Sequence, residues 1–324
     1  MKGSRVAAAA RRRRGILADR QAAPRVASAA MHTVYRHFEN QAQIDAQYNT
    51  ALTVADPPAQ IAHYAEQAGR ARAQLRCTLD VAFGPTRDET LDIFPADRPG
   101  APVFVFIHGG YWRAFTSKEF SGVALGLQPL GITTVVVNYA LCPRVSIDEI
   151  TRQTRAALAW VLRHAGEHGG DPSRVAIGGH SAGAHLAAMC LQTRWDEDYA
   201  LPQDPLRSAV LVSGLYDLEP LRYSYLQPQI QLDDGIVRRN SPAFGVRRCA
   251  TPVWVTWGGA ETQEFARQSQ VYHDAWRAAG NRSELSALPG ANHFSAIHGL
   301  EDPSSPLCQW LARSLEAGPA RSGG

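Results

Sequence analysis

The sequence has no long apolar run and little cysteine. A membrane-spanning helix needs about 18 consecutive apolar residues, and no stretch of the 324 residues approaches that length. The five cysteines are widely spaced and form no Cys-x-x-Cys pair, which argues against a disulfide framework. We therefore expect no membrane partner, a reducing, cytoplasmic compartment, and buried free thiols at Cys77, Cys142, Cys190, Cys249 and Cys308.

The net positive charge of the chain comes from its first thirty residues. The whole chain has a net charge of +3, but residues 1–30 hold eight Lys and Arg against one acid, Asp19. Residues 31–324 therefore have a net charge of −4. A mildly acidic charge over residues 31–324 does not indicate a phosphate-binding surface, so we expect no nucleic-acid partner.

The basic N-terminal segment lacks the apolar region of a secretory signal. Arg11–Arg14 resembles a twin-arginine signal, but charges within residues 15–20 interrupt the apolar run that would have to follow. An Arg- and Ala-rich, acid-poor stretch is also typical of a transit peptide. We expect residues 1–30 to be a disordered basic extension, followed by one domain over 31–317 and a flexible tail over 318–324.

Strand-like and helical segments alternate along most of the chain. A helical segment over about 38–73 precedes strands near 75–83 and 90–94, and βα units follow from residue 102. This alternation predicts an α/β fold with helices on both faces of a mostly parallel sheet. The segment 196–240, rich in Tyr, Gln, Pro and Leu, is poorly periodic, and we predict that it forms a lid or a substrate-facing insertion.

A Gly-x-Ser-x-Gly motif at Gly179–Gly183 is the most informative feature of the sequence. A β-type run at 174–177 precedes it and an apolar helical run at 184–191 follows it, which is the context of a nucleophile elbow. Small residues flank the serine because its backbone makes a strained turn while strand and helix approach closely. The motif predicts that Ser181 is a nucleophile, with a plain βα turn as the alternative.

A second glycine-rich motif, His-Gly-Gly at 108–110, follows the apolar strand predicted at 103–107. Acyl transfer builds negative charge on the carbonyl oxygen of the substrate. Backbone N–H groups in a glycine loop can point at this oxygen without hindrance from side chains. We therefore predict an oxyanion hole formed by the N–H groups of Gly109, Gly110 and Ala182.

A nucleophilic serine needs a histidine base, and in this architecture the chain order is Ser, then Asp or Glu, then His. His293 lies in a loop directly after the strand-like run 284–288. Loops at strand ends bring catalytic side chains to a shared site. His273 falls inside a helical pattern and His298 is a second choice, so we predict that His293 is the base.

The acid that orients the histidine is predicted by the same chain order. Glu261 lies in the loop after the late strand at 252–257, and it is our first choice. Asp217 also follows a strand, at 209–213, and is the competing residue. Glu264 lies in the first turn of the next predicted helix, where an acid favours the helix N-terminus without any catalytic role.

One motif points to a different chemistry. Residues 164–168 match the His-x-x-Glu-His pattern of inverzincins. They lie at the end of a predicted helix, before Gly169 and Gly170, where histidines and glycines are explained by helix termination. Because no clear third ligand accompanies His164 and His168, we expect neither a metal site nor any other cofactor.

Together these motifs resemble α/β-hydrolases related to hormone-sensitive-lipase-type esterases, and within them the arylformamidase (kynurenine formamidase) branch. Family members carry an Asp before Ser-Pro-Glu-Phe, whereas this chain has Glu261 before Thr-Gln-Glu-Phe. By position, the resemblance therefore assigns the acid to Glu261. It covers most of the chain from about Tyr48 and rests on HGGYW at 108–112, GHSAGAHLAA at 179–188, SGLYDLEPL at 213–221, Asn240-Ser241-Pro242 and ETQEFARQS at 261–269.

The resemblance implies an α/β-hydrolase fold and a serine hydrolase that cleaves a small acyl amide or ester through an acyl-enzyme. The expected activity is that of an arylformamidase acting on N-formylkynurenine-type substrates. A general short-chain carboxylesterase is the alternative, and a non-catalytic binding protein on the same fold is a third. We expect a small-molecule acyl amide or ester as partner, and a homodimer is left open.

Six residues are candidates for contact with such a substrate. Tyr111 and Trp112 follow the oxyanion loop and Tyr216 follows a late strand, so their rings could stack on an aryl group, although packing would also explain them. A carboxylate on the substrate would need a cation, and the nearest candidates in the sequence are Arg113, Arg144 and Arg222.

Overall fold

The computed structural model describes residues 33–316, so the predicted basic extension and flexible tail lie outside the described residues. Within this range eight strands form one sheet in the order β1-β2-β4-β3-β5-β6-β7-β8. β2 pairs antiparallel with β1 and β4, and all other neighbours are parallel. The strands are β1 (Thr78–Ala82), β2 (Thr90–Phe94), β3 (Ala101–Ile107), β4 (Thr133–Val137), β5 (Gly170–His180), β6 (Leu206–Val212), β7 (Val253–Gly258) and β8 (Ser283–Leu288).

Helices fill most of the connections between the strands, as the alternating pattern predicts. The expected N-terminal helical segment consists of two helices, and Asp56 begins the second by accepting a hydrogen bond from the N–H of Ala59. The α-helices are α1 (Gln41–Tyr48), α2 (Pro57–Gln74), α3 (Ala124–Leu127), α4 (Ile147–His164), α5 (Ala182–Leu191), α6 (Trp195–Tyr199), α7 (Gln227–Ile230), α8 (Asp234–Asn240), α9 (Gln263–Ala278) and α10 (Pro306–Glu316).

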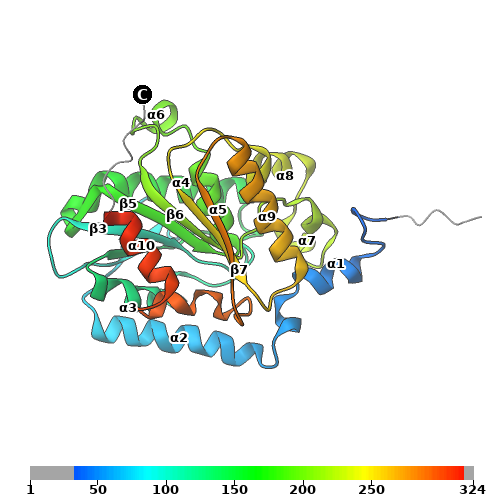
Figure 1. Cartoon of the computed structure of the whole chain (residues 1–324), viewed down its shortest axis with the longest axis horizontal. Helices are drawn as coiled ribbons and strands as arrows, with labels where there is room; N and C mark the ends of the chain where they lie inside the picture. The colour runs from blue at the N-terminus through cyan, green and yellow to red at the C-terminus, as the bar shows by residue number, and fades with distance from the viewer. Residues whose placement is uncertain (1–32, 317–324) are drawn as a thin grey trace, which may run out of the picture. The chain divides into compact units, whose positions relative to one another are not determined.

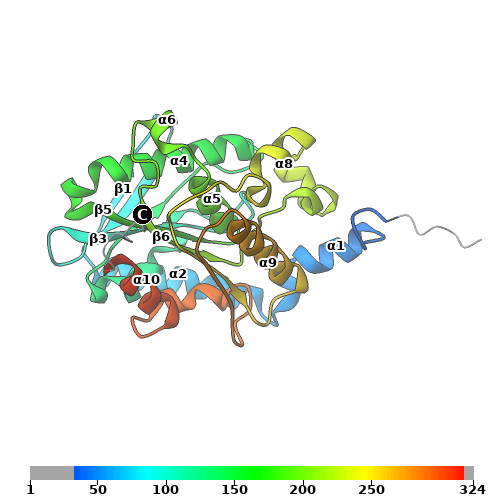
Figure 2. The same cartoon turned by 45° about the horizontal axis from the view of Figure 1, so that its top comes forward.

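The side chains of β3 show how the sheet is covered on both faces. Val103, Val105 and Ile107 belong to one buried cluster, which includes residues of α4, α5 and α9. Phe104 and Phe106 point the other way and belong to a second cluster with residues of α2, α3 and α10. Figures 1 and 2 show α4, α5 and α9 on one side of the sheet and α2 and α10 on the other.

The segment 196–240 is not a single insertion, and that part of the prediction is wrong. It contains β6 (Leu206–Val212), which pairs with β5 and β7 in the middle of the sheet. Only the part after β6 is irregular, with the 3₁₀ helix η6 (Glu219–Tyr223) followed by α7 and α8. The strand expected at 209–213 corresponds to β6, so the predicted insertion began too early in the chain.

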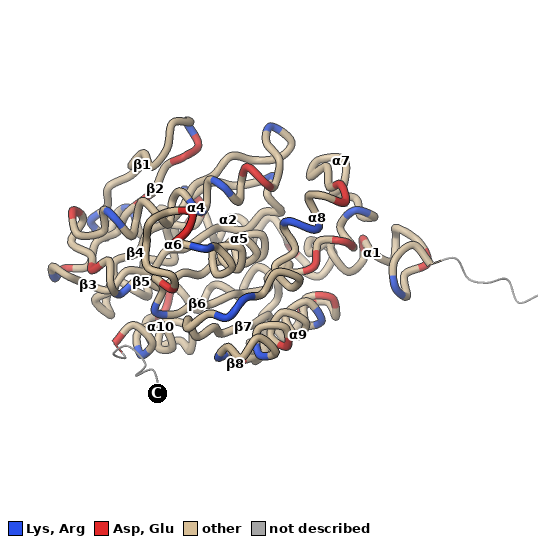
Figure 3. The backbone as a smooth tube through the Cα atoms, turned by 90° about the horizontal axis from the view of Figure 1, so that it is seen from above, with Lys and Arg blue, Asp and Glu red and all other residues tan. Residues whose placement is uncertain are grey.

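Charged residues of both signs are interspersed along the described chain, as Figure 3 shows. No helix within residues 33–316 is both long enough and apolar enough to cross a membrane.

Candidate active site

A cavity of about 390 Å³ lies where several parallel strands end. The loops after β3, β5 and β8 contribute Gly110, Ser181 and His293 to its lining. Carboxyl ends of parallel strands meet at one edge of a sheet, which is why residues far apart in sequence converge here. Half of the remaining lining residues are Phe or Tyr, namely Tyr64, Tyr111, Phe115, Phe120, Tyr225 and Phe294.

Ser181 occupies the turn between β5 and α5. Its backbone has φ 56° and ψ −117°, a region that non-glycine residues rarely adopt. The turn needs glycine on both sides, because a Cβ on Gly183 would lie 1.9 Å from the carbonyl oxygen of Ile107 and one on Gly179 would lie 2.4 Å from the Gly183 backbone. The Ser181 hydroxyl is buried, lines the cavity and has no hydrogen-bond partner among residues 33–316.

His293 and Glu261 form a buried pair next to this serine. The Nδ1 of His293 donates to Oε2 of Glu261 over 2.7 Å, and the two side chains are 6% and 1% exposed. The other carboxylate oxygen of Glu261 accepts from the N–H of Gly258 over 2.6 Å and from the hydroxyl of Ser213. Because Nδ1 carries the hydrogen, Nε2 of His293 is left with a lone pair.

The competing candidates for base and acid are engaged elsewhere. The carboxylate of Asp217 accepts from the Tyr35 hydroxyl over 2.8 Å and from the N–H of Glu219 over 3.1 Å. His273 lies on α9, where its Nδ1 is 2.8 Å from the Ser283 hydroxyl. His298 stacks at a centroid distance of 4.0 Å on another histidine, and none of the three candidates lines the cavity.

Three backbone N–H groups lie in the loops that flank Ser181. Those of Gly109, Gly110 and Ala182 donate to no other group within the described part of the chain. Gly110 has φ +107°, and a Cβ there would lie 2.3 Å from the carbonyl oxygen of Ala114, so the loop requires glycine at this position. Such free donors next to a serine that lines the cavity can bind an oxyanion.

His180 is a functional candidate that sequence reasoning missed. Its Nε2 donates to the backbone carbonyl of His293 over 2.8 Å, and its Nδ1 faces no hydrogen-bond partner in the described chain. Desolvation by burial holds the pKa of His180 well below its usual range, so the ring is neutral. The signal available in the sequence was its place directly before Ser181 in the elbow motif.

Two of the three aromatic candidates do not line the cavity, and packing, the alternative, describes them. Trp112 is completely buried and donates from Nε1 to Nδ1 of His185 over 3.2 Å, on the α5 side of the sheet. Tyr216 is also completely buried and stacks on Tyr272 at a centroid distance of 4.4 Å. Both follow a strand end in sequence, but their side chains turn into the core. Tyr111 does line the cavity.

The N-terminal segment forms a wall of the cavity that no motif predicted. Residues 49–51 and Tyr64 line it, and the Tyr64 hydroxyl donates over 2.6 Å to the carbonyl oxygen of Phe294. The Tyr111 hydroxyl donates to the carbonyl oxygen of Tyr48 over 2.5 Å, which ties the segment to the oxyanion loop. These are contacts between distant parts of the chain, and local patterns do not reveal them.

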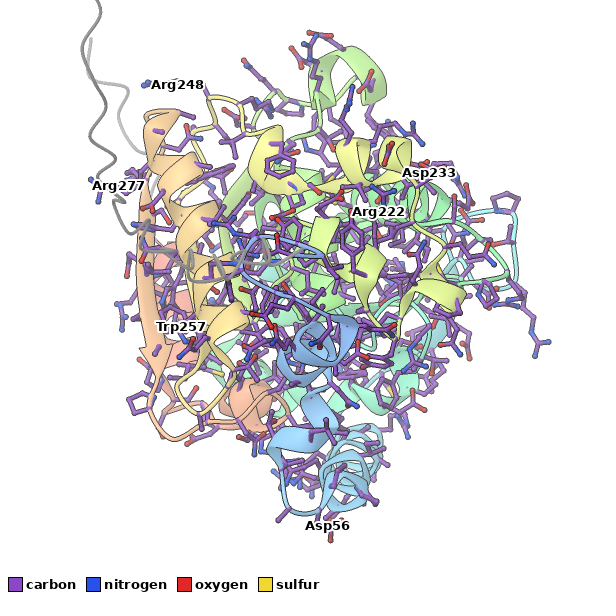
Figure 4. The ribbon with its side chains drawn as sticks, turned by 90° about the vertical axis from the view of Figure 1, so that its right-hand side faces the viewer. Asp56, Arg222, Asp233, Arg248, Trp257 and Arg277 are labelled. Carbon is purple, nitrogen blue, oxygen red and sulfur yellow. The ribbon has the colours of Figure 1, made fainter. Side chains whose placement is uncertain are left out.

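Of the three candidate arginines, only Arg113 lines the cavity. Its Nη1 donates to Gln229 over 2.6 Å, its guanidinium carbon lies 5.9 Å from the centre of the Tyr225 ring, and its buried Nε has no hydrogen-bond partner in the described chain. Arg144 pairs with an acid outside the cavity. Arg222, labelled in Figure 4, lies on η6 and pairs with Glu219 and with a second acid.

The His-x-x-Glu-His segment ends α4 and continues into a 3₁₀ turn. The rings of His164 and His168 lie against Trp160 at centroid distances of 4.8 and 5.5 Å. Glu167 accepts from His164 over 2.9 Å. These contacts are typical of a helix end on the protein surface.

Comparison with known proteins places the chain among hydrolases. Residues 104–244 match a family described as having the alpha/beta hydrolase fold. The kynurenine formamidase of Danio rerio is 32% identical over 254 residues, which cover 76% of this chain and 84% of the relative. The esterase LipQ of Mycobacterium tuberculosis is 29% identical over 67% of this chain and 56% of its own length.

Solved structures agree with this placement. A protein of Silicibacter sp. TM1040, provisionally assigned as a thioesterase, is 28% identical with a TM-score of 0.74, over 85% of this chain and 99% of that one. An esterase of Pyrobaculum calidifontis shares the fold with a TM-score of 0.65 at 17% identity, over 86% of this chain and 98% of that one. The protein is a hydrolase, and the chain belongs to the kynurenine formamidase branch of the α/β-hydrolase-fold enzymes.

Proposed function

We propose that this chain hydrolyses N-formyl aryl amines of the N-formylkynurenine type, with Ser181 as nucleophile, His293 as base and Glu261 as the orienting acid. The observation that carries the catalytic part is the buried set of groups around one cavity. A serine hydroxyl without a hydrogen-bond partner and a histidine whose Nδ1 donates to a carboxylate both border this cavity. These are the parts that an acyl-transfer enzyme needs.

The proposed first half-reaction forms an acyl-enzyme. Oγ of Ser181 attacks the formyl carbon while Nε2 of His293 takes the hydroxyl proton. The carbonyl oxygen becomes an oxyanion, which accepts hydrogen bonds from the N–H groups of Gly109, Gly110 and Ala182. His293 then gives its proton to the leaving aryl amine, and the C–N bond breaks to leave a formyl ester on Ser181.

The second half-reaction returns the free enzyme. A water enters as the amine leaves, His293 takes its proton, and the resulting nucleophile attacks the formyl ester. The ester bond breaks with return of the proton to Oγ of Ser181, and formate is released. Glu261 stabilises the imidazolium form of His293 in both steps, and its second oxygen, which accepts from Gly258 and Ser213, holds the carboxylate in place.

The composition of the cavity supports an aromatic amide with a carboxylate. Six aromatic side chains line it, and rings of this kind favour stacking with an aryl group. Arg113 is the cation in the same lining, and its buried Nε still has a free N–H. The kynurenine formamidase relatives from Danio rerio and Salmo salar, both 32% identical, support the same substrate class.

A general short-chain carboxylesterase is the second candidate function. The esterase relatives of Mycobacterium tuberculosis favour it, since their names assign ester substrates. The mechanism is the same for both functions, so the difference lies only in the acyl and leaving-group sides of the cavity.

The homodimer and the cytoplasmic location also stay predictions. Light scattering of the purified protein would test whether it forms a homodimer.

Comparison of kcat/KM for N-formylkynurenine, p-nitrophenyl acetate and p-nitrophenyl butyrate tests the proposed specificity. We expect the formamide to be the best substrate and butyrate to be poorer than acetate, since each methylene that a pocket accepts or rejects is worth about 1–3 kcal/mol. A much higher kcat/KM for butyrate than for the formamide would reject the formamidase in favour of the esterase. No turnover of any of the three would reject both.

A further inference from the structure

A cluster of three potential metal ligands lies outside the catalytic cavity. His63 comes from α2, and His298 and Glu301 come from the 3₁₀ helix η8 (Ser295–Glu301). One ligand atom of each residue lies within 4.8 Å of those of the other two. His63 Nε2 is 2.8 Å from Oε2 of Glu301, and the two imidazole centroids are 4.0 Å apart with 32° between the ring planes.

One nitrogen of the cluster has no partner. The buried Nε2 of His298 makes no hydrogen bond within residues 33–316. Buried polar groups are normally hydrogen-bonded or bound to a metal, so this nitrogen next to a carboxylate is a candidate ligand for a cation.

We propose that His63, His298 and Glu301 bind a divalent transition-metal ion of the zinc class. Two imidazole nitrogens and one carboxylate oxygen form a three-ligand set that leaves a fourth tetrahedral position for water. Magnesium and calcium prefer sets made of oxygen alone, so this set disfavours them. His63 would bind through Nε2, with its hydrogen moved to Nδ1, and its present contact to Glu301 would be replaced by two bonds to the ion.

The position of the cluster indicates a structural role for the ion. It would join α2 to η8, and η8 begins two residues after His293. The neighbour of His63 in α2 is Tyr64, whose hydroxyl already holds the carbonyl of Phe294 and whose ring lines the catalytic cavity. An ion at this place would therefore link the N-terminal wall of the cavity to the loop that carries His293.

The three ligands themselves do not line the catalytic cavity. Hydrolysis should therefore persist after dialysis against EDTA, whereas the melting temperature should fall. An ion that binds only the folded state stabilises that state by mass action, so its removal should lower the melting temperature. The inference does not depend on which substrate the hydrolase prefers.

Titration of the full-length, EDTA-treated protein with Zn²⁺ by calorimetry, and with Co²⁺ by visible absorption, tests the proposal. We expect one tight site, a visible spectrum of tetrahedral Co²⁺, and a rise in Tm with Zn²⁺. His298→Gln and Glu301→Gln should each weaken Zn²⁺ binding by more than about 100-fold, since loss of a direct ligand exceeds the 10–100-fold effect of losing an outer partner. Two variants are used so that poor folding of one does not prevent the comparison.

His164→Gln is the matched control, because His164 also pairs with a glutamate and belongs to the other metal-like motif. It should bind Zn²⁺ like the unaltered protein. The proposal is overturned if the unaltered protein binds no Zn²⁺, if both folded cluster variants bind as it does, or if the His164 variant alone loses binding. The last outcome would move the site to the end of α4.

Discussion

The ring of His180 donates from Nε2 to the backbone carbonyl of His293 over 2.8 Å, across 113 residues of sequence. The residue directly before the proposed nucleophile therefore holds the backbone of the proposed base. The two rings also pack together at a centroid distance of 4.7 Å. His180 is in this sense a positioning residue, since its contact sets where the imidazole of His293 can lie relative to Ser181.

We expect His180→Asn to lower kcat by about 10-fold or more while KM stays nearly unchanged, in the range of lost outer-shell contacts in other sites. The physical reason is that the base would sample more orientations while the cavity keeps its shape. His185→Asn is the control, because His185 is equally buried but contacts Trp112 and Asn240 instead of His293. Equal loss of kcat in both folded variants would contradict the positioning role.

Ser181→Ala should lower kcat by about 10⁴-fold or more and leave the folded state intact. The hydroxyl makes no hydrogen bond with residues 33–316, so its removal leaves no described group without a partner. Single-turnover kinetics together with circular dichroism would measure both effects. Turnover near that of the unaltered protein in a folded variant would remove Ser181 from the mechanism.

The two candidate acids can be separated by isosteric amides. Glu261→Gln should cost orders of magnitude in kcat, because an amide cannot stabilise the imidazolium of His293 as the carboxylate does. Asp217→Asn should cost far less, since its carboxylate holds Tyr35 and the backbone of Glu219 instead. Steady-state kinetics would measure kcat of both variants. A larger loss of kcat in Asp217→Asn than in Glu261→Gln would assign the orienting role to Asp217.

Arg113→Gln should raise KM for N-formylkynurenine by about 10- to 100-fold, because the loss of a hydrogen bond to a charged group weakens binding by about this factor. The same change should leave p-nitrophenyl acetate, which has no carboxylate, almost unaffected. Arg144→Gln is the control, since Arg144 pairs with Asp88 away from the cavity. A similar effect of Arg113→Gln on both substrates would show that this arginine maintains the cavity and does not recognise the carboxylate.

The buried histidines should make the free energy of unfolding depend on pH. Burial lowers the pKa of His108 and of His185 to about 4, and that of His180 falls well below its usual range. The unfolded chain binds these protons near pH 6.5, so the folded state loses stability as pH falls from about 6.5 toward 4. For three such groups the slope approaches about 4 kcal/mol per pH unit.

Guanidinium unfolding at several pH values between about 5 and 7.5 would measure this slope above the range where most carboxylates titrate. His185→Gln should reduce the slope by about one proton if it folds. A free energy of unfolding that does not change between pH 5 and 6.5 would contradict the neutral, buried state of these rings.

The sequence predicted the parts of the site that depend on chain order and on strand ends. Ser181, Glu261 and His293 each follow a strand-like run that becomes β5, β7 or β8, and the carboxyl ends of parallel strands meet. Trp112 and Tyr216 lie at strand ends in the same way, yet they are buried in the core. The direction of a side chain that follows a strand depends on its packing against α5 and α9. The hydrophobic periodicity of the sequence does not predict this direction.

The wall formed by Asn49 and Tyr64 could not be predicted for a different reason. Both residues lie before the first strand of the sheet. Tyr64 donates to the carbonyl oxygen of Phe294, and Tyr48, which precedes Asn49, accepts from Tyr111. A single sequence carries no signal for such distant contacts.

The residues that line the cavity come from distant parts of the chain, and this has a consequence for synthesis on the ribosome. One wall is made of residues near position 50, which leave the ribosome early, whereas His293 is among the last residues added. The proposed base of Ser181 is therefore absent until residue 293 has been added. A chain that stops before residue 293 would contain the proposed nucleophile without its proposed base, so we expect it to have no hydrolytic activity.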